Sequence, residues 1–156
     1  MVTHLGGRLC TCGRHGCWEQ YASATGLIRR TEEEMEASPR SILHTVAKEN
    51  GAVDGRTAFQ AAERGDQVAI HLCREYAEEL GCGLVNLINL LHPERVAIGG
   101  GVAAAPESLL LQPLREIVTR ESYARHGGVI PAVVRAQMGN DAGIIGAALL
   151  DRAVRE

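Results

Sequence analysis

Three cysteines near the start of the chain are close enough in sequence to share one metal ion. Cys10, Cys12 and Cys17 fall within eight residues, and Gly13 and Gly16 between them allow the loop to fold back on itself. Three thiolates at about 2.3 Å supply three corners of the tetrahedron that structural zinc prefers. The spacing therefore predicts a structural zinc site at Cys10, Cys12 and Cys17.

The fourth zinc ligand stays open on these residues alone. His15 lies inside the loop and His4 lies six residues before Cys10, so both are local candidates. A redox pair is disfavoured, because Cys10 and Cys12 lack the two-residue separation of redox motifs. The simpler alternative is a loop of free thiols. The other two cysteines, Cys73 and Cys82, lie in helix-like sequence and are predicted to be buried small apolar residues.

The elements that must position this loop alternate between helix and strand. Apolar spacing and turn residues predict helices over 18–37, 41–48, 57–64, 66–92, 106–122 and 142–153, and strands over 95–98 and 129–136. This order predicts an α/β fold with a parallel sheet. Two strands are few for such a sheet, so further strands are expected from residues outside this chain or from ones overlooked near the N-terminus.

Composition restricts the class of protein further. The chain has 156 residues, 46% of them hydrophobic, which is enough to bury the core of a single domain. A net charge of -3 leaves no basic face for a nucleic-acid backbone, so nucleic-acid binding through this segment is disfavoured. The sequence shows no membrane span and no secretory signal. The crowded, odd-numbered cysteines suit a reducing compartment, so we expect a cytoplasmic protein.

Residues 10–23, CTCGRHGCWEQYAS, resemble the C-x-C-G-x-x-G-C-x-E signature of the ROK family of sugar kinases and repressors, especially its glucokinase branch. The resemblance continues through the glycines at 99–101 and the segment GNDAGIIGAA at 139–148, and so covers essentially the whole chain. It implies the C-terminal lobe of an actin-like ATPase (ribonuclease H-like) fold. Residues 1–23 would be the zinc loop and sugar-contact segment, 24–92 a helical segment and 93–156 the α/β segment on the adenosine side.

The resemblance also assigns roles to single residues. Glu19 matches a position that accepts hydrogen bonds from sugar hydroxyls, although a glutamate in a first helical turn can simply complement the helix dipole. Gly99, Gly100 and Gly101 match glycines that pack against the adenosine of ATP, although alone they indicate only a tight turn. The family's fourth zinc ligand is a histidine about ten residues before the first cysteine, which corresponds to the position immediately before Met1.

The resemblance implies an ATP-dependent hexose kinase that acts on glucose. Its cofactors would be structural Zn²⁺ and, in the whole protein, ATP and Mg²⁺. Its assembly would be a dimer or a tetramer. The family carries its phosphate loop and catalytic aspartate before the zinc loop. We therefore expect no catalytic residue here and an inactive isolated chain; Asn140 or Asp141 is expected to cap the last helix rather than catalyse. The alternatives are the sugar-sensing domain of a ROK repressor and a zinc-stabilised scaffold without ligand.

Overall fold

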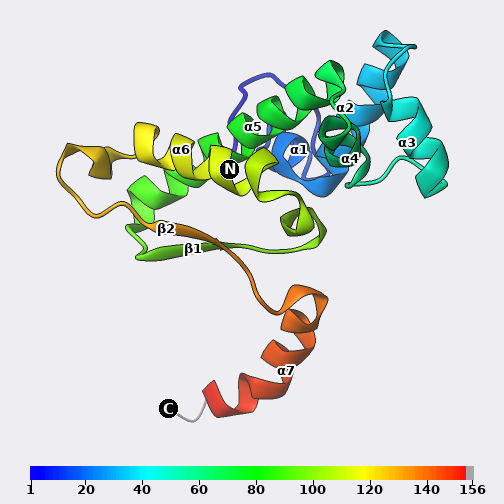
Figure 1. Ribbon diagram of the computed structural model, residues 1–156. Coiled ribbons are helices and arrows are strands. Elements are labelled where there is room, and N and C mark those ends of the chain that lie inside the picture. Colours follow the sequence, from blue (N-terminus) through cyan, green and yellow to red (C-terminus); the bar gives the residue numbers. More distant parts are fainter. Residues whose placement is uncertain (154–156) are drawn as a thin grey trace.

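A long central helix organises the fold. The computed structural model describes residues 1–153, apart from the side chains of Asn140 and residues 151–153. Its helices are α1 (Glu19–Ala22), α2 (Ala24–Ala37), α3 (Leu43–Asn50), α4 (Thr57–Glu63), α5 (Gln67–Leu91), α6 (Leu111–Glu121) and α7 (Ala142–Ala153), and its strands are β1 (Arg95–Ile98) and β2 (Ala132–Arg135). Short 3-10 turns occupy Gly101–Ala104, Glu107–Leu109, Tyr123–His126 and Gly139–Asp141. Helix α5 runs through the middle of this arrangement (Figure 1).

The core forms where α2, α4 and α6 pack around α5, and α3 packs against α4. Its largest fully buried side chains include Leu27, Leu43, Leu72, Tyr76 and Leu114. Aliphatic residues dominate because the chain has few aromatic ones; the ring of Phe59 meets the ring of Tyr76 edge-on at 6.4 Å. This helical body is the platform on which the cysteine loop rests.

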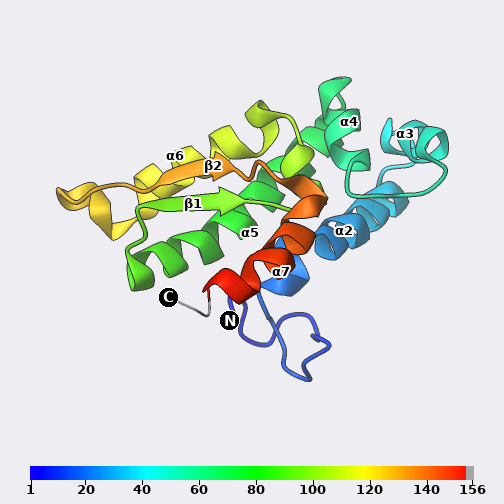
Figure 2. The same cartoon turned by 90° about the horizontal axis from the view of Figure 1, so that it is seen from below.

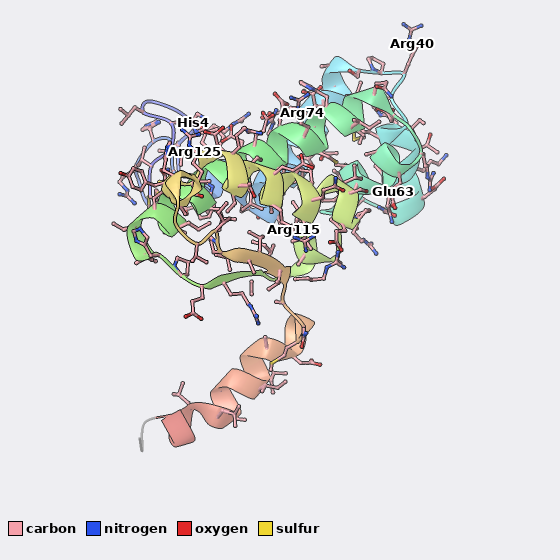
Figure 3. The ribbon with its side chains drawn as sticks, turned by 60° about the vertical axis from the view of Figure 1, so that its left-hand side comes forward. His4, Arg40, Glu63, Arg74, Arg115 and Arg125 are labelled. Atoms are coloured by element: carbon pink, nitrogen blue, oxygen red, sulfur yellow. The ribbon has the colours of Figure 1, made fainter. Side chains whose placement is uncertain are left out.

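The two strands are parallel, as the sequence predicts, and α6 connects them. Arg95 pairs with Ala132 and Ile98 with Arg135. Val96 and Ile98 are half-buried while Arg95 and Ala97 are exposed, so the described residues cover one face of the sheet. Figure 2 shows α5 behind the strands, and α7 beside them and nearer to the viewer. Arg115 of α6 (Figure 3) holds β2 by donating from Nε to the Val133 carbonyl oxygen at 2.9 Å.

No further strand occurs in the described part of the chain. Residues 1–18 make only two isolated antiparallel bridges, Val2 with Cys17 and Leu9 with His15. The prediction of overlooked N-terminal strands is therefore wrong. Among residues 1–153, no helix is both long and apolar enough to span a membrane.

Several predicted elements have different boundaries. The helix predicted over 18–37 breaks at Ser23, whose backbone is extended and whose Oγ accepts from the Gly26 N–H at 3.0 Å. The helix predicted from 106 begins as a 3-10 turn, and the second strand is shorter than predicted. Cys73 is buried as predicted, and burial raises its thiol pKa to about 12. The prediction for Cys82 is wrong, because this residue falls on the exposed side of α5.

Helix α7 lies apart from the helical body (Figure 1). Its apolar residues Ile144, Leu149 and Leu150 are exposed. Asp141, at the start of this helix, is exposed as well. The predicted cap by the side chain of Asn140 lies outside the described residues.

Asp66 joins the start of α5 to the start of α3. Its Oδ1 accepts from the Ala69 N–H at 2.9 Å, and its Oδ2 accepts from the Ser41 hydroxyl at 2.9 Å and from the Ile42 N–H. Burial raises the pKa of this carboxyl, but the three donors favour the charged form more strongly, and the net pKa is lowered.

Replacing Asp66 with alanine should lower the free energy of unfolding by about 2 to 3 kcal/mol at pH 7, through loss of the helix cap and the two other hydrogen bonds. Because the folded-state pKa is depressed, this contribution is present above the unfolded pKa of about 3.9 and is lost as pH falls through the folded value. Urea unfolding of both proteins at pH 7 and near pH 3 measures it. Equal stabilities at pH 7 would contradict the assignment.

Candidate metal centre and adjoining ligand site

Residues 1–18 form a loop that folds back onto itself. Its return path passes so close to His4 that a Cβ at Gly16 would lie 1.4 Å from the His4 carbonyl oxygen. Gly16 also has φ of +74° and Gly13 has φ of +81°, a left-handed conformation that favours glycine. Arg8 attaches the loop to α2 through two hydrogen bonds to the Glu33 carboxylate, at 2.7 and 2.6 Å.

The loop brings the three predicted cysteine ligands together. Their Sγ atoms all lie within 4.8 Å of one another, and those of Cys12 and Cys17 are 3.5 Å apart. Sulfurs bound tetrahedrally at about 2.3 Å from zinc would be about 3.8 Å apart, so the spacing fits three corners of such a site. Cys10 and Cys17 are buried and Cys12 is exposed. Within residues 1–153, no other histidine, cysteine or carboxylate joins this group.

Both local candidates for the fourth ligand are engaged elsewhere. His15 Nδ1 lies 3.0 Å from the Gly7 carbonyl oxygen. The His4 ring stacks on Tyr21 at 4.2 Å, and its Nε2 lies 3.4 Å from the Glu79 carboxylate.

The fourth ligand therefore stays a prediction from the family pattern. The Trp18 N–H donates to the Met1 carbonyl oxygen at 2.9 Å, so the backbone at Met1 runs beside the start of α1. A histidine immediately before Met1 would enter this same region.

The thiols of the loop differ in acidity. The pKa of Cys12 is lowered to about 6. The largest cause is a hydrogen bond with the side chain of Arg14, and smaller ones are hydrogen bonds with the Arg14 backbone and with the other two cysteines of the loop. The pKa of Cys17 is raised to about 11, mainly by its hydrogen bond with Cys12 and secondly by burial. At neutral pH Cys12 is thus a thiolate, the form that a metal would require, whereas Cys17 is a thiol that a metal would have to deprotonate.

Glu19 follows the loop directly, in the first turn of α1. Trp18 fixes the start of this helix, because its Nε1 donates to the Glu79 carbonyl oxygen at 2.8 Å and its ring lies against Gly83 of α5. The Glu19 carboxylate is exposed, and its Oε2 lies 3.9 Å from Cys10 Sγ. The loop that gathers the sulfurs therefore also places this carboxylate.

The glycine turn follows β1 and lies between two hollows. Gly100 has φ of +78°, and a 3-10 turn starts at Gly101. One hollow of about 290 Å³ is lined by the α1–α2 junction and the turn: Ala22, Ser23, Ala24, Tyr76, Leu80, Ile98, Gly99, Gly100, Gly101 and Val102. The other, of about 450 Å³, is lined by Arg56, Phe59, Gln60, Glu63, Gly101, Ala104, Ala105, Pro106, Glu107 and Arg135. The glycine turn and the segment after Glu19 thus share one hollow.

Comparison with known proteins identifies the family of the chain. The model of the ROK family matches residues 2–154. The chain belongs to the ROK family. Its α/β architecture with parallel strands is accordingly part of the actin-like ATPase fold of ROK proteins.

Individual ROK relatives fall into two functional groups. The chain is 36% identical over 149 residues to a glucokinase of Streptomyces coelicolor, covering 94% of this chain and 47% of that protein. A crystal structure of a ROK family glucokinase from Streptomyces griseus in complex with glucose and AMPPNP superimposes with a TM-score of 0.79 at 36% identity, covering 96% of this chain and 49% of that one. The DNA-binding transcriptional repressor Mlc of Escherichia coli is 28% identical over 148 residues, covering 95% of this chain and 35% of the repressor. The ROK chain spans about half the length of the glucokinases it matches.

The structure adds residues to the site that sequence reasoning missed. Gly83 lies in α5 and Glu33 in α2, far along the sequence from the loop that they support. Arg8 belongs to no recognisable sequence motif, and Gly83 is an isolated glycine within a long helical pattern. A glycine inside a helix lowers stability relative to alanine, so its presence at position 83 indicates that another group packs closely there. This is the sequence signal from which the contact at Gly83 could have been predicted.

Proposed function

We propose that this ROK chain is the part of an ATP-dependent hexose kinase that binds glucose through Glu19 and the adenosine of ATP at Gly99, Gly100 and Gly101. The observation that carries the proposal is the similarity, over 96% of the chain, to a glucokinase solved with glucose and AMPPNP. The exposed carboxylate of Glu19, held next to the cysteine loop, supports the sugar assignment.

The chemistry of sugar binding follows from the carboxylate. An ionised carboxylate only accepts hydrogen bonds, and its two oxygens can accept from two neighbouring hydroxyls of a pyranose. Cys10, Cys12 and Cys17 would hold a structural zinc ion, which would lock the loop and hence the direction from which Glu19 approaches the sugar.

The glycine turn suits the other substrate. Without side chains, the backbone at Gly99 and Gly100 can approach a nucleoside closely, and the adjoining hollow of about 290 Å³ is lined mainly by small and apolar residues. The phosphate loop, the Mg²⁺ ligands and the catalytic aspartate belong, by the family pattern, to the other half of the kinase. The 156-residue chain alone is accordingly expected to make no sugar phosphate. We also propose a homo-oligomer.

A second candidate function is the sugar-sensing domain of a transcriptional repressor. It is favoured by the similarity to Mlc over 95% of the chain. The higher identity to glucokinases ranks the kinase first.

The test uses the protein as expressed from its gene. We expect it to bind glucose in calorimetry and to form glucose 6-phosphate from ATP in a coupled assay, and we expect Glu19→Gln to weaken glucose binding by about 100-fold, as loss of charged hydrogen bonds to two hydroxyls implies. Glucose binding with sequence-specific DNA binding and no phosphoryl transfer would support the repressor instead. Absence of glucose binding would refute both.

A further inference from the structure

Glu19 is the carboxylate to which the proposed function assigns the sugar, and two other side chains fix it. Glu19 Oε2 accepts a hydrogen bond from Gln20 Nε2 at 2.6 Å. Gln20 Oε1 in turn accepts from a guanidinium nitrogen of Arg29 at 2.9 Å. We propose that Gln20 and Arg29 are positioning residues that orient the Glu19 carboxylate toward the hydroxyl groups of a hexose. The inference rests on the proposed function and deepens it.

Arg29 determines which end of the Gln20 amide faces Glu19. A guanidinium has five N–H donors and no acceptor, so only the amide oxygen can face Arg29. The amide nitrogen is then left to face the carboxylate, as a donor. Without Arg29, the Gln20 amide could turn over and present its oxygen to Glu19, which would repel the carboxylate.

The hydrogen bonds of Arg29 within the described residues all go to Gln20. A second guanidinium nitrogen donates to the backbone carbonyl oxygen of Gln20. The ion pairs among the described residues do not include Arg29, whereas its neighbour Arg30 pairs with Glu75. Arg29 Nε is buried without a partner within residues 1–153. Leaving a buried donor unpaired is unfavourable, so ordinary surface pairing does not explain the position of this side chain.

The backbone is shaped to permit this contact. Helix α2 passes so close to α1 that a Cβ at Gly26 would lie 2.8 Å from the Gln20 carbonyl oxygen. Arg29 lies about one turn further along α2 and reaches back to α1 from there.

The contact leaves Oε1 of Glu19, and the second lone pair of Oε2, for sugar hydroxyls. Gln20 and the Cys10 sulfur both lie on Oε2, and no hydrogen bond to Oε1 is made within residues 1–153. The hydrogen bond to Oε2 restricts rotation of the carboxylate, while Oε1 keeps its lone pairs for a donating hydroxyl. The positive charge of Arg29 also polarises the amide and strengthens the hydrogen bond that it donates to Glu19.

The decisive variant is Gln20→Glu, measured in the zinc-loaded protein as expressed from its gene. The new carboxylate can still accept from Arg29, so the melting temperature and zinc content should stay unchanged. It cannot donate to Glu19 and places a second negative charge beside it, so glucose affinity in calorimetry should fall at least about 10-fold. An unchanged glucose affinity would overturn the inference, because a merely structural contact predicts that result.

Gln112→Glu is the matched control. Gln112 Nε2 donates to Glu116 on α6 at 3.2 Å, so the same chemical change is made in a similar pair away from the loop. Glucose affinity should not change in this variant. A loss equal to that of Gln20→Glu would point to a general charge effect and contradict the inference.

A readout without sugar separates this inference from the proposed function. In ¹⁵N-resolved spectra, the side-chain amide of Gln20 should shift in Glu19→Ala and lose its ordered signal in Arg29→Met. If both changes occur but the wild type binds no hexose, the proposed function fails while the orientation of Glu19 by Gln20 and Arg29 stands. If Arg29→Met leaves the Gln20 amide unchanged, the inference fails whether or not sugar binds.

Discussion

Replacing Cys17 with serine should weaken zinc binding by at least about 100-fold. Structural zinc in small domains contributes about 10 to 16 kcal/mol over four ligands, so one ligand accounts for roughly 3 kcal/mol or more. The Cys17 sulfur lies 3.5 Å from that of Cys12, and a hydroxyl in its place cannot supply the thiolate. Competition with a chromophoric chelator measures the affinity, and metal analysis after dialysis measures the remaining zinc.

Two further variants make this result specific. Cys17 is buried, so its replacement could disturb packing by itself, whereas Cys12 is exposed and Cys12→Ser should lose zinc with little packing damage. Cys82→Ser is the matched control, because Cys82 is exposed on α5 and lies outside the sulfur group. Full zinc occupancy and unchanged affinity in both loop variants would show that these cysteines do not form the metal site.

Loss of zinc should also lower the local stability of the helix turn that carries Glu19. The loop is attached to the helical body through Arg8, Tyr21 and Trp18, so the core itself should remain folded in the zinc-free protein. A zinc ion bound by the three cysteines would add the closure of residues 10–17, which lie just before α1. We therefore expect the zinc-free chain to keep its helix content while the first residues of α1 exchange their amide protons faster.

Local sequence patterns sufficed for the parts of the fold that depend on near neighbours. The strand Arg95–Ile98 has the boundaries that the pattern predicts, and the closing helix begins at Ala142 as predicted, because Pro93, Gly99 and Gly139 mark these points. The convergence of the three sulfurs follows from their spacing and from the glycines between them. These features need no knowledge of distant residues.

The features that sequence reasoning missed depend on how one helix packs against another. A helical pattern runs through Ser23, but this residue caps α2 by accepting from the Gly26 N–H, and α2 then passes close to the Gln20 carbonyl oxygen. Cys82 has an apolar side chain in an apolar helix, but the side of α5 on which it falls is decided by where α6 packs. The contact of Arg29 with Gln20 likewise joins two helices, and nothing in its local sequence indicates it.

Gly83→Ala should strongly destabilise the contact between α5 and the start of α1. A Cβ at Gly83 would lie 2.1 Å from Cε2 and 2.4 Å from Nε1 of the Trp18 indole. Because the backbone of α5 is fixed by the core on its other side, the indole must move and its hydrogen bond to the Glu79 carbonyl oxygen must break. Overpacking of this kind costs about 1 to 3 kcal/mol, and the lost hydrogen bond adds about 1 kcal/mol.

The consequence should extend beyond stability, since Trp18 lies between Cys17 and Glu19. Trp18 is the one tryptophan of the sequence, so its fluorescence reports this contact directly; its emission should shift to the red in Gly83→Ala as the ring moves into water. Zinc and glucose affinity should fall together, because the same ring fixes the end of the loop and the first turn of α1. Gly146→Ala is the matched control: it also adds a methyl group within a helix, but beyond the helix's own backbone no described residue has an atom within 4 Å of the new Cβ, and there alanine should be neutral or stabilising. If Gly83→Ala left the emission, zinc affinity and stability unchanged, Trp18 could not be the residue that joins the metal loop to the ligand carboxylate.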